Sequence, residues 1–113
     1  MFCLLVPALG HTCDWTRLAF DLDGIGFDGL MGPPDGKRYL DYEFCAPADL
    51  ATLRRLQGIS PTLRCHPGAS GRSACHPGQA LCIGSTESPH WRVDLCRLTT
   101  LPFVQQVLPT WWE

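Results

Sequence analysis

The sequence predicts an α+β fold, because the order strand–helix–strand occurs twice in the last two-thirds of the chain. The expected elements are strands over 39–45, 62–66, 79–85 and 103–112, and helices over 48–57 and 89–101. Two such units in a row predict one sheet, and right-handed crossovers place both helices on the same face of it.

The first unit begins with a strand over 39–45 in which apolar and polar residues alternate. This period of two is typical of a strand with one buried face. Pro47 and Asp49 suit the first turn of the helix that follows. Gly58 suits the end of that helix. We therefore expect the helix to stop before Gly58, and the strand over 62–66 to follow it.

The second unit begins with Leu81 and Ile83 in a strand and continues with Ser88-Pro89, a typical helix start. Pro109 interrupts the last predicted strand. Proline is tolerated at a sheet edge, so we expect this strand to lie at an edge.

Together these elements predict a ferredoxin-like βαββαβ sandwich, with a four-stranded antiparallel sheet and two helices on one face. We assign residues 38–113 to this domain and residues 1–37 to an N-terminal extension that could add one strand. The expected core residues are Leu40, Tyr42, Phe44, Leu53, Leu56, Ile83, Leu95 and Leu98.

Length and charge narrow the classes of function. A chain of 113 residues is one domain by length. Its formal net charge is −2, which is no electrostatic footprint for nucleic acid. No apolar run reaches the roughly 18 residues of a membrane span. We expect neither nucleic acid nor a membrane among its partners.

The cysteines predict a reducing compartment. Residues 2–9 are apolar, but the run is short, contains Pro7 and has no basic residue before it, unlike a secretory signal. An odd number of cysteines without such a signal favours free thiols and a cytoplasmic location. The seven cysteines are Cys3, Cys13, Cys45, Cys65, Cys75, Cys82 and Cys96.

The tetrapeptide Cys-His-Pro-Gly occurs twice, at 65–68 and 75–78. It offers four side chains that can bind zinc. Neighbouring side chains of an extended segment point to opposite faces, however, so we expect no stoichiometric zinc and no other cofactor. A disulfide across the hairpin between the two cysteines is a further possibility. The candidate metal ligands are Cys65, His66, Cys75 and His76.

The first of these tetrapeptides and the residues after it resemble the phosphate-binding loop of cysteine phosphatases. In that loop a thiolate and an arginine enclose phosphate. Here six residues instead of five separate Cys65 from Arg72, and His66 follows the cysteine instead of preceding it. No helix pattern follows to lower the pKa of the thiol. We expect no phosphatase, but Ser70, Gly71 and Arg72 could form an anion-binding nest.

The sequence Leu-Ala-Phe-Asp-Leu-Asp-Gly at 18–24 resembles the first motif of haloacid-dehalogenase-type phosphatases. The resemblance implies Asp21 as nucleophile and Asp23 as acid and base, with Mg²⁺. That family also needs a downstream lysine and a late acidic pair. Lys37 is the only lysine, and the late acidic residues are not paired. We expect no catalysis at this motif.

These observations favour a small non-catalytic binding or protein-interaction module of unknown ligand. The sheet face away from the helices, which would carry Asp41 and Glu43, is the expected contact surface for a second copy or another protein. The alternative is a metal- or thiol-dependent site at the hairpin with the Cys-His pairs. A phosphoryl-transfer enzyme is a third, less favoured class.

Overall fold

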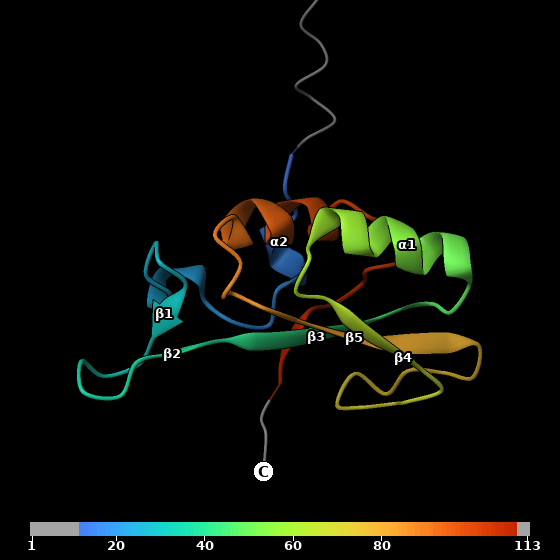
Figure 1. Cartoon of the computed structure of the whole chain (residues 1–113), viewed down its shortest axis with the longest axis horizontal. Coiled ribbons are helices and arrows are strands. Elements are labelled where there is room, and N and C mark those ends of the chain that lie inside the picture. Colours follow the sequence, from blue (N-terminus) through green and yellow to red (C-terminus); the bar gives the residue numbers. More distant parts are fainter. Residues whose placement is uncertain (1–11, 111–113) are drawn as a thin grey trace, which may run out of the picture.

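A computed structural model describes residues 12–110 (Figure 1). This range contains two short 3-10 helices, two α-helices and six strands. In chain order these are η2 (Trp15–Arg17), η3 (Leu22–Gly24), β1 (Leu30–Met31), β2 (Arg38–Tyr39), β3 (Asp41–Pro47), α1 (Leu50–Ile59), β4 (Arg64–Pro67), β5 (Gln79–Ser85), α2 (Trp91–Thr99) and β6 (Leu108–Pro109).

The larger sheet of the described residues has the strand order β4-β5-β3-β6, and every neighbouring pair is antiparallel. Its centre is the seven-residue ladder between β3 and β5, which runs from the pair Asp41–Ser85 to the pair Pro47–Gln79. Figure 1 shows α1 and α2 side by side above this sheet. Strands β1 and β2 form a separate two-stranded sheet that projects from one end.

The prediction of a ferredoxin-like sandwich built on a single sheet is wrong. The described residues form two sheets, and β6 has two residues instead of the ten expected over 103–112. Proline has no backbone N–H, so Pro109 cannot donate to the ladder. The backbone before β6 pairs elsewhere: the Val107 amide donates to the Arg17 carbonyl, and the Ala19 amide donates to the Val107 carbonyl. Trp111 and Trp112, at the end of the predicted strand, lie outside the described residues.

Six of the eight expected core residues are buried, which confirms that part of the prediction: Leu40, Tyr42, Phe44, Leu56, Leu95 and Leu98. Leu53 is partly buried and packs against this core. Ile83 pairs with Glu43 across the ladder, so it points away from the helices. The core also includes Ile25 from the N-terminal part of the chain, together with Trp91 of α2.

Helix α1 begins two residues later than expected, at Leu50, and ends two residues later than expected, at Ile59; Pro47 is the last residue of β3. The Asp49 side chain accepts a hydrogen bond from the Thr52 amide at 2.8 Å, and this N-terminal cap lowers the pKa of Asp49. Gly58 does not end the helix, which continues to Ile59. Because Ile59 is buried, its packing favours two further helical residues over a stop before the glycine.

Tyr42 packs across Gly84 on the neighbouring strand. A Cβ atom at Gly84 would lie 2.8 Å from the Tyr42 ring, so only glycine leaves room for it. Among the described residues the buried Tyr42 hydroxyl has no hydrogen-bond partner. Burial raises the pKa of this phenol.

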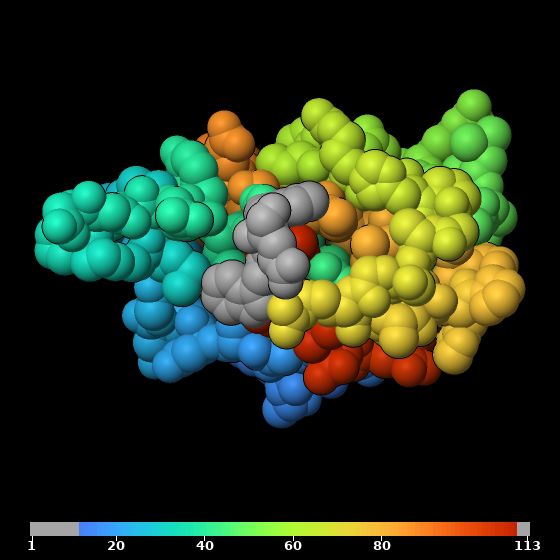
Figure 2. Space-filling model, turned by 90° about the horizontal axis from the view of Figure 1, so that it is seen from below, coloured from blue at the N-terminus to red at the C-terminus, as the bar shows by residue number. Residues whose placement is uncertain are grey.

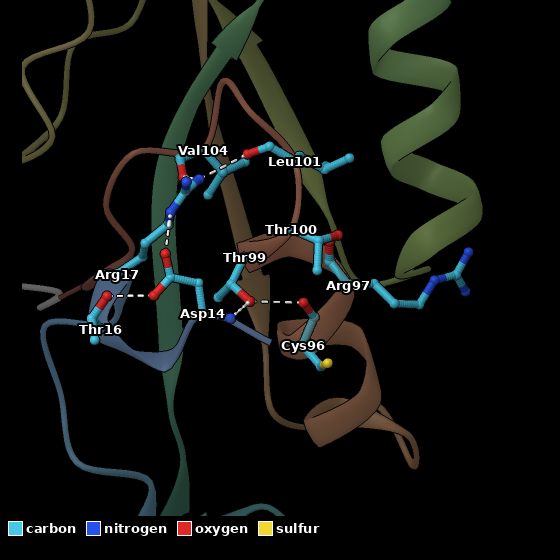
Figure 3. A network of polar contacts seen from close by, with 9 residues as sticks. All are labelled: Asp14, Thr16, Arg17, Cys96, Arg97, Thr99, Thr100, Leu101 and Val104. Carbon is cyan, nitrogen blue, oxygen red and sulfur yellow. Dashed lines mark hydrogen bonds and ion pairs between the residues drawn. The ribbon is translucent and has the colours of Figure 1, made fainter. Parts of the chain in front are cut away.

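The segment around η2 is fastened to the end of α2 (Figure 3). Arg17 donates to the carbonyls of Leu101 and Val104 at 3.0 and 2.8 Å, and pairs with Asp14 at 3.0 Å. The Asp14 amide donates to the Thr99 hydroxyl. These contacts make the start of the described chain part of the folded body.

Candidate functional site

Six cysteines of the described chain are joined in disulfides: Cys13–Cys96, Cys45–Cys75 and Cys65–Cys82. The expectation of reduced thiols is therefore wrong for these six, and Cys3 lies outside the described residues. Strand register explains one bond, because Cys65 and Cys82 are direct partners in the ladder between β4 and β5. The proposed Cys65–Cys75 bond is also wrong.

The structure does not bring the four candidate zinc ligands together. Cys65 is bonded to Cys82 on β5, and Cys75 is bonded to Cys45 on β3. His66 and His76 are exposed. Zinc binds thiolates, which disulfide sulfurs are not. Within residues 12–110, no group of three or more histidine, cysteine, aspartate or glutamate side chains could hold a metal ion.

The candidate anion-binding residues Ser70, Gly71 and Arg72 lie in the loop between β4 and β5, and Arg72 is exposed. Next to them, the amide and the hydroxyl of Ser73 both donate to Glu43 Oε2 at 2.9 Å. Gly71 has a φ of +60°, and a Cβ atom there would lie 2.8 Å from the same oxygen. This loop therefore presents donors to a carboxylate of the protein itself.

Glu43 is the centre of this arrangement, although only 2% of its surface is exposed. Its other oxygen accepts a hydrogen bond from the Thr110 hydroxyl at 3.0 Å. Figure 2 views the face away from the helices and shows residues around 70 lying across it. This loop, fixed by the Cys45–Cys75 bond, covers part of the sheet face that we expected to be open.

The phosphatase-like motif at 18–24 forms a local turn. The Asp21 side chain accepts a hydrogen bond from the Asp23 amide at 2.9 Å and caps η3. Both aspartates are exposed, as is Lys37 between β1 and β2. The two carboxylates therefore stand at the surface.

The turn over residues 26–29, which we call the Phe27 tip, presents an aromatic ring to solvent. The Phe27 side chain is 96% exposed. Its backbone is nevertheless held, since the Phe27 carbonyl accepts a hydrogen bond from the Trp91 indole at 3.0 Å. The Thr86 hydroxyl donates to the Gly29 carbonyl at 2.6 Å, and the Gly26 amide donates to the Leu30 carbonyl at 2.8 Å.

Gly29 makes this anchoring possible. Its φ is +85°, and a Cβ atom there would lie 2.1 Å from the Thr86 carbonyl oxygen. No other residue allows so close a backbone approach with that conformation. The tip is therefore locked against the start of α2, beside which it lies in Figure 1.

A cavity of about 270 Å³, which we call the α2 cavity, adjoins the Phe27 tip. Val93 at its rim is 57% exposed. Arg92 brings positive charge, and its guanidinium carbon lies 5.6 Å from the centroid of the Trp15 ring. The residues that line the cavity are Ile25, Phe27, Pro89, His90, Trp91, Arg92 and Val93. This surface combines exposed apolar groups with a fixed backbone and a cationic rim.

We did not predict this surface from the sequence. Residues 26–29 fall in the predicted N-terminal extension over 1–37, and residues 89–93 fall in the predicted helix over 89–101. The only local indication was Phe27 beside the turn-forming pair Asp28-Gly29. Apolar residues in turns are common, so this pattern does not indicate a binding surface. That Phe27 stands in solvent follows from long-range contacts to Thr86 and Trp91.

No protein-family model, no curated protein and no solved structure matches the chain. Neither α-helix of residues 12–110 has the length and apolar character needed to span a membrane.

Proposed function

We propose that the chain is a non-catalytic protein-interaction module, and that its partner contact is made by the Phe27 tip and the α2 cavity. The observation that supports this most directly is the exposure of Phe27 on a backbone held by hydrogen bonds to core residues.

Two physical arguments support the Phe27 tip as a contact surface. Leaving a phenylalanine side chain in water forgoes about 1.5–3 kcal/mol of burial free energy. A ring on a preorganised turn loses little conformational freedom on binding, so most of that free energy is available to a complex. Aromatic side chains of this kind often dominate interface energies. The sheet face first expected to carry the contact is partly occupied by the protein's own loop.

We further propose that the module works in an oxidising compartment instead of the cytoplasm. The three disulfides of the described residues support this, since such bonds are rare where thiols are kept reduced. Protein isolated from its own cells, denatured without reductant and alkylated should carry at most one label, on Cys3. Seven labels per chain, as counted by mass spectrometry, would instead support the cytoplasmic assignment.

The interaction itself is tested by a photo-reactive phenylalanine analogue at position 27. We expect it to cross-link one protein partner in the fluid or compartment that holds the native chain. Added wild-type chain should compete with this cross-link, and a Phe27→Ser chain should not.

The matched control is the same analogue at Leu50, which is 62% exposed on α1. It presents a similar ring away from the tip and should give no competed cross-link. Equal yields at the two positions, or none at position 27, would refute the proposed contact surface.

A further inference from the structure

Resting on that proposed function, we infer that the partner is a second copy of this chain, with the Phe27 tip of each protomer seated in the α2 cavity of the other. The cavity is large enough for a phenyl ring, and the tip and the cavity carry side chains of opposite charge, Asp28 and Arg92.

The Phe27 tip and the α2 cavity lie next to each other on one protomer. A volume of about 270 Å³ accommodates a phenyl ring, and the cavity walls contributed by Ile25, Trp91 and Val93 are apolar. Phe27 lies at the rim of its own protomer's cavity, so it cannot fill that cavity while its ring stays 96% exposed. A two-fold rotation about an axis beside the tip places each ring over the other cavity. Such an isologous pairing uses one surface patch twice.

The charges beside the tip and the cavity also favour a second copy of the chain as the occupant. Asp28 stands next to Phe27, is exposed, and turns one carboxylate oxygen to the Leu30 amide at 3.1 Å. Arg92, whose guanidinium carbon lies 5.6 Å from the centroid of the Trp15 ring, lines the cavity. Among the described residues, Asp28 and Arg92 of one protomer form no ion pair with each other. The two-fold arrangement brings each Asp28 to the cationic rim of the other chain.

The tip is small, so we expect the affinity of the dimer to be low. Stable complexes bury about 1,600 Å² in total, far more than two phenyl rings and their surroundings supply. We therefore expect a rapidly exchanging dimer with a dissociation constant on the order of 0.1–1 mM.

Sedimentation equilibrium and NMR relaxation across protein concentrations from about 20 μM to 2 mM measure this association. The wild-type chain should show a rising average mass. Phe27→Ser should raise the dissociation constant at least tenfold, because the anchoring ring is lost. Leu50→Ser, which removes an exposed apolar side chain elsewhere, should behave as the wild type.

Reversing the charge at either position tests the proposed contact between Asp28 of one chain and Arg92 of the other. Asp28→Lys and Arg92→Glu each place like charges at both contacts of the dimer, so each variant alone should be monomeric. In an equimolar mixture the introduced lysine faces the introduced glutamate, while the native aspartate of one chain faces the native arginine of the other. We therefore expect dimers to return on mixing.

The outcomes separate the two proposals. A wild-type chain that is monomeric at 2 mM, or charge variants that do not associate when mixed, would overturn the inference of self-association. A competed cross-link from position 27 to a protein of different mass would then leave the interaction module standing with another partner. Absence of both signals would refute both proposals.

Discussion

Replacing Cys13 and Cys96 together by serine is expected to lower the free energy of unfolding by about 4.5 kcal/mol. The bond joins residues 83 positions apart. A cross-link that closes so long a loop removes much conformational entropy from the unfolded chain. Arg17 and the contacts between Ala19 and Val107 keep the segment in place, so the folded structure should persist.

Urea unfolding followed by tryptophan fluorescence measures this loss. The control is the pair Cys65→Ser and Cys82→Ser, whose bond spans 17 residues and should contribute about 3 kcal/mol. The longer loop must give the larger loss for the entropic explanation to hold. An equal or reversed order would show that local strain or packing decides the effect.

Glu43→Ala is expected to destabilise the protein by about 1–3 kcal/mol, the cost of leaving buried hydrogen-bond donors without their acceptor. The substitution leaves three donors without their acceptor: the amide and hydroxyl of Ser73 and the hydroxyl of Thr110. It also leaves space under Gly71, which approaches this carboxylate closely. Hydrogen exchange at the Ser73 amide should rise together with the loss of stability.

Two control variants show whether the loss of stability is specific to the buried carboxyl group. Glu43→Gln keeps the shape and one oxygen acceptor, so its loss should be clearly smaller. Glu87→Ala removes an exposed glutamate and should change stability by no more than about 0.5 kcal/mol. If Glu43→Ala costs less than about 1 kcal/mol, the loop between β4 and β5 does not depend on the buried carboxylate.

Local patterns were sufficient where short-range physics decides the structure. The alternation over 39–45 correctly placed Leu40, Tyr42 and Phe44 in the core. Pro47 and Asp49 indicated the start of α1 to within a few residues, and in the structure Asp49 is its N-terminal cap. Both signals depend on neighbours within a few positions, because a strand alternates its faces and a cap binds the amide three residues later.

The order of the main helices and strands and the apolar face of the central strand could be predicted from local sequence patterns. The tertiary structure decided which cysteines pair, because Cys13 and Cys96 meet only after α2 packs on the N-terminal segment. It also decided that Glu43 is buried and that Phe27 is exposed, against the polarity of both side chains. In each case the deciding contact joins residues far apart in the chain: Thr110 for Glu43, and Trp91 for Phe27. Sequence periodicity cannot predict such contacts, since they depend on how the folded elements pack against one another.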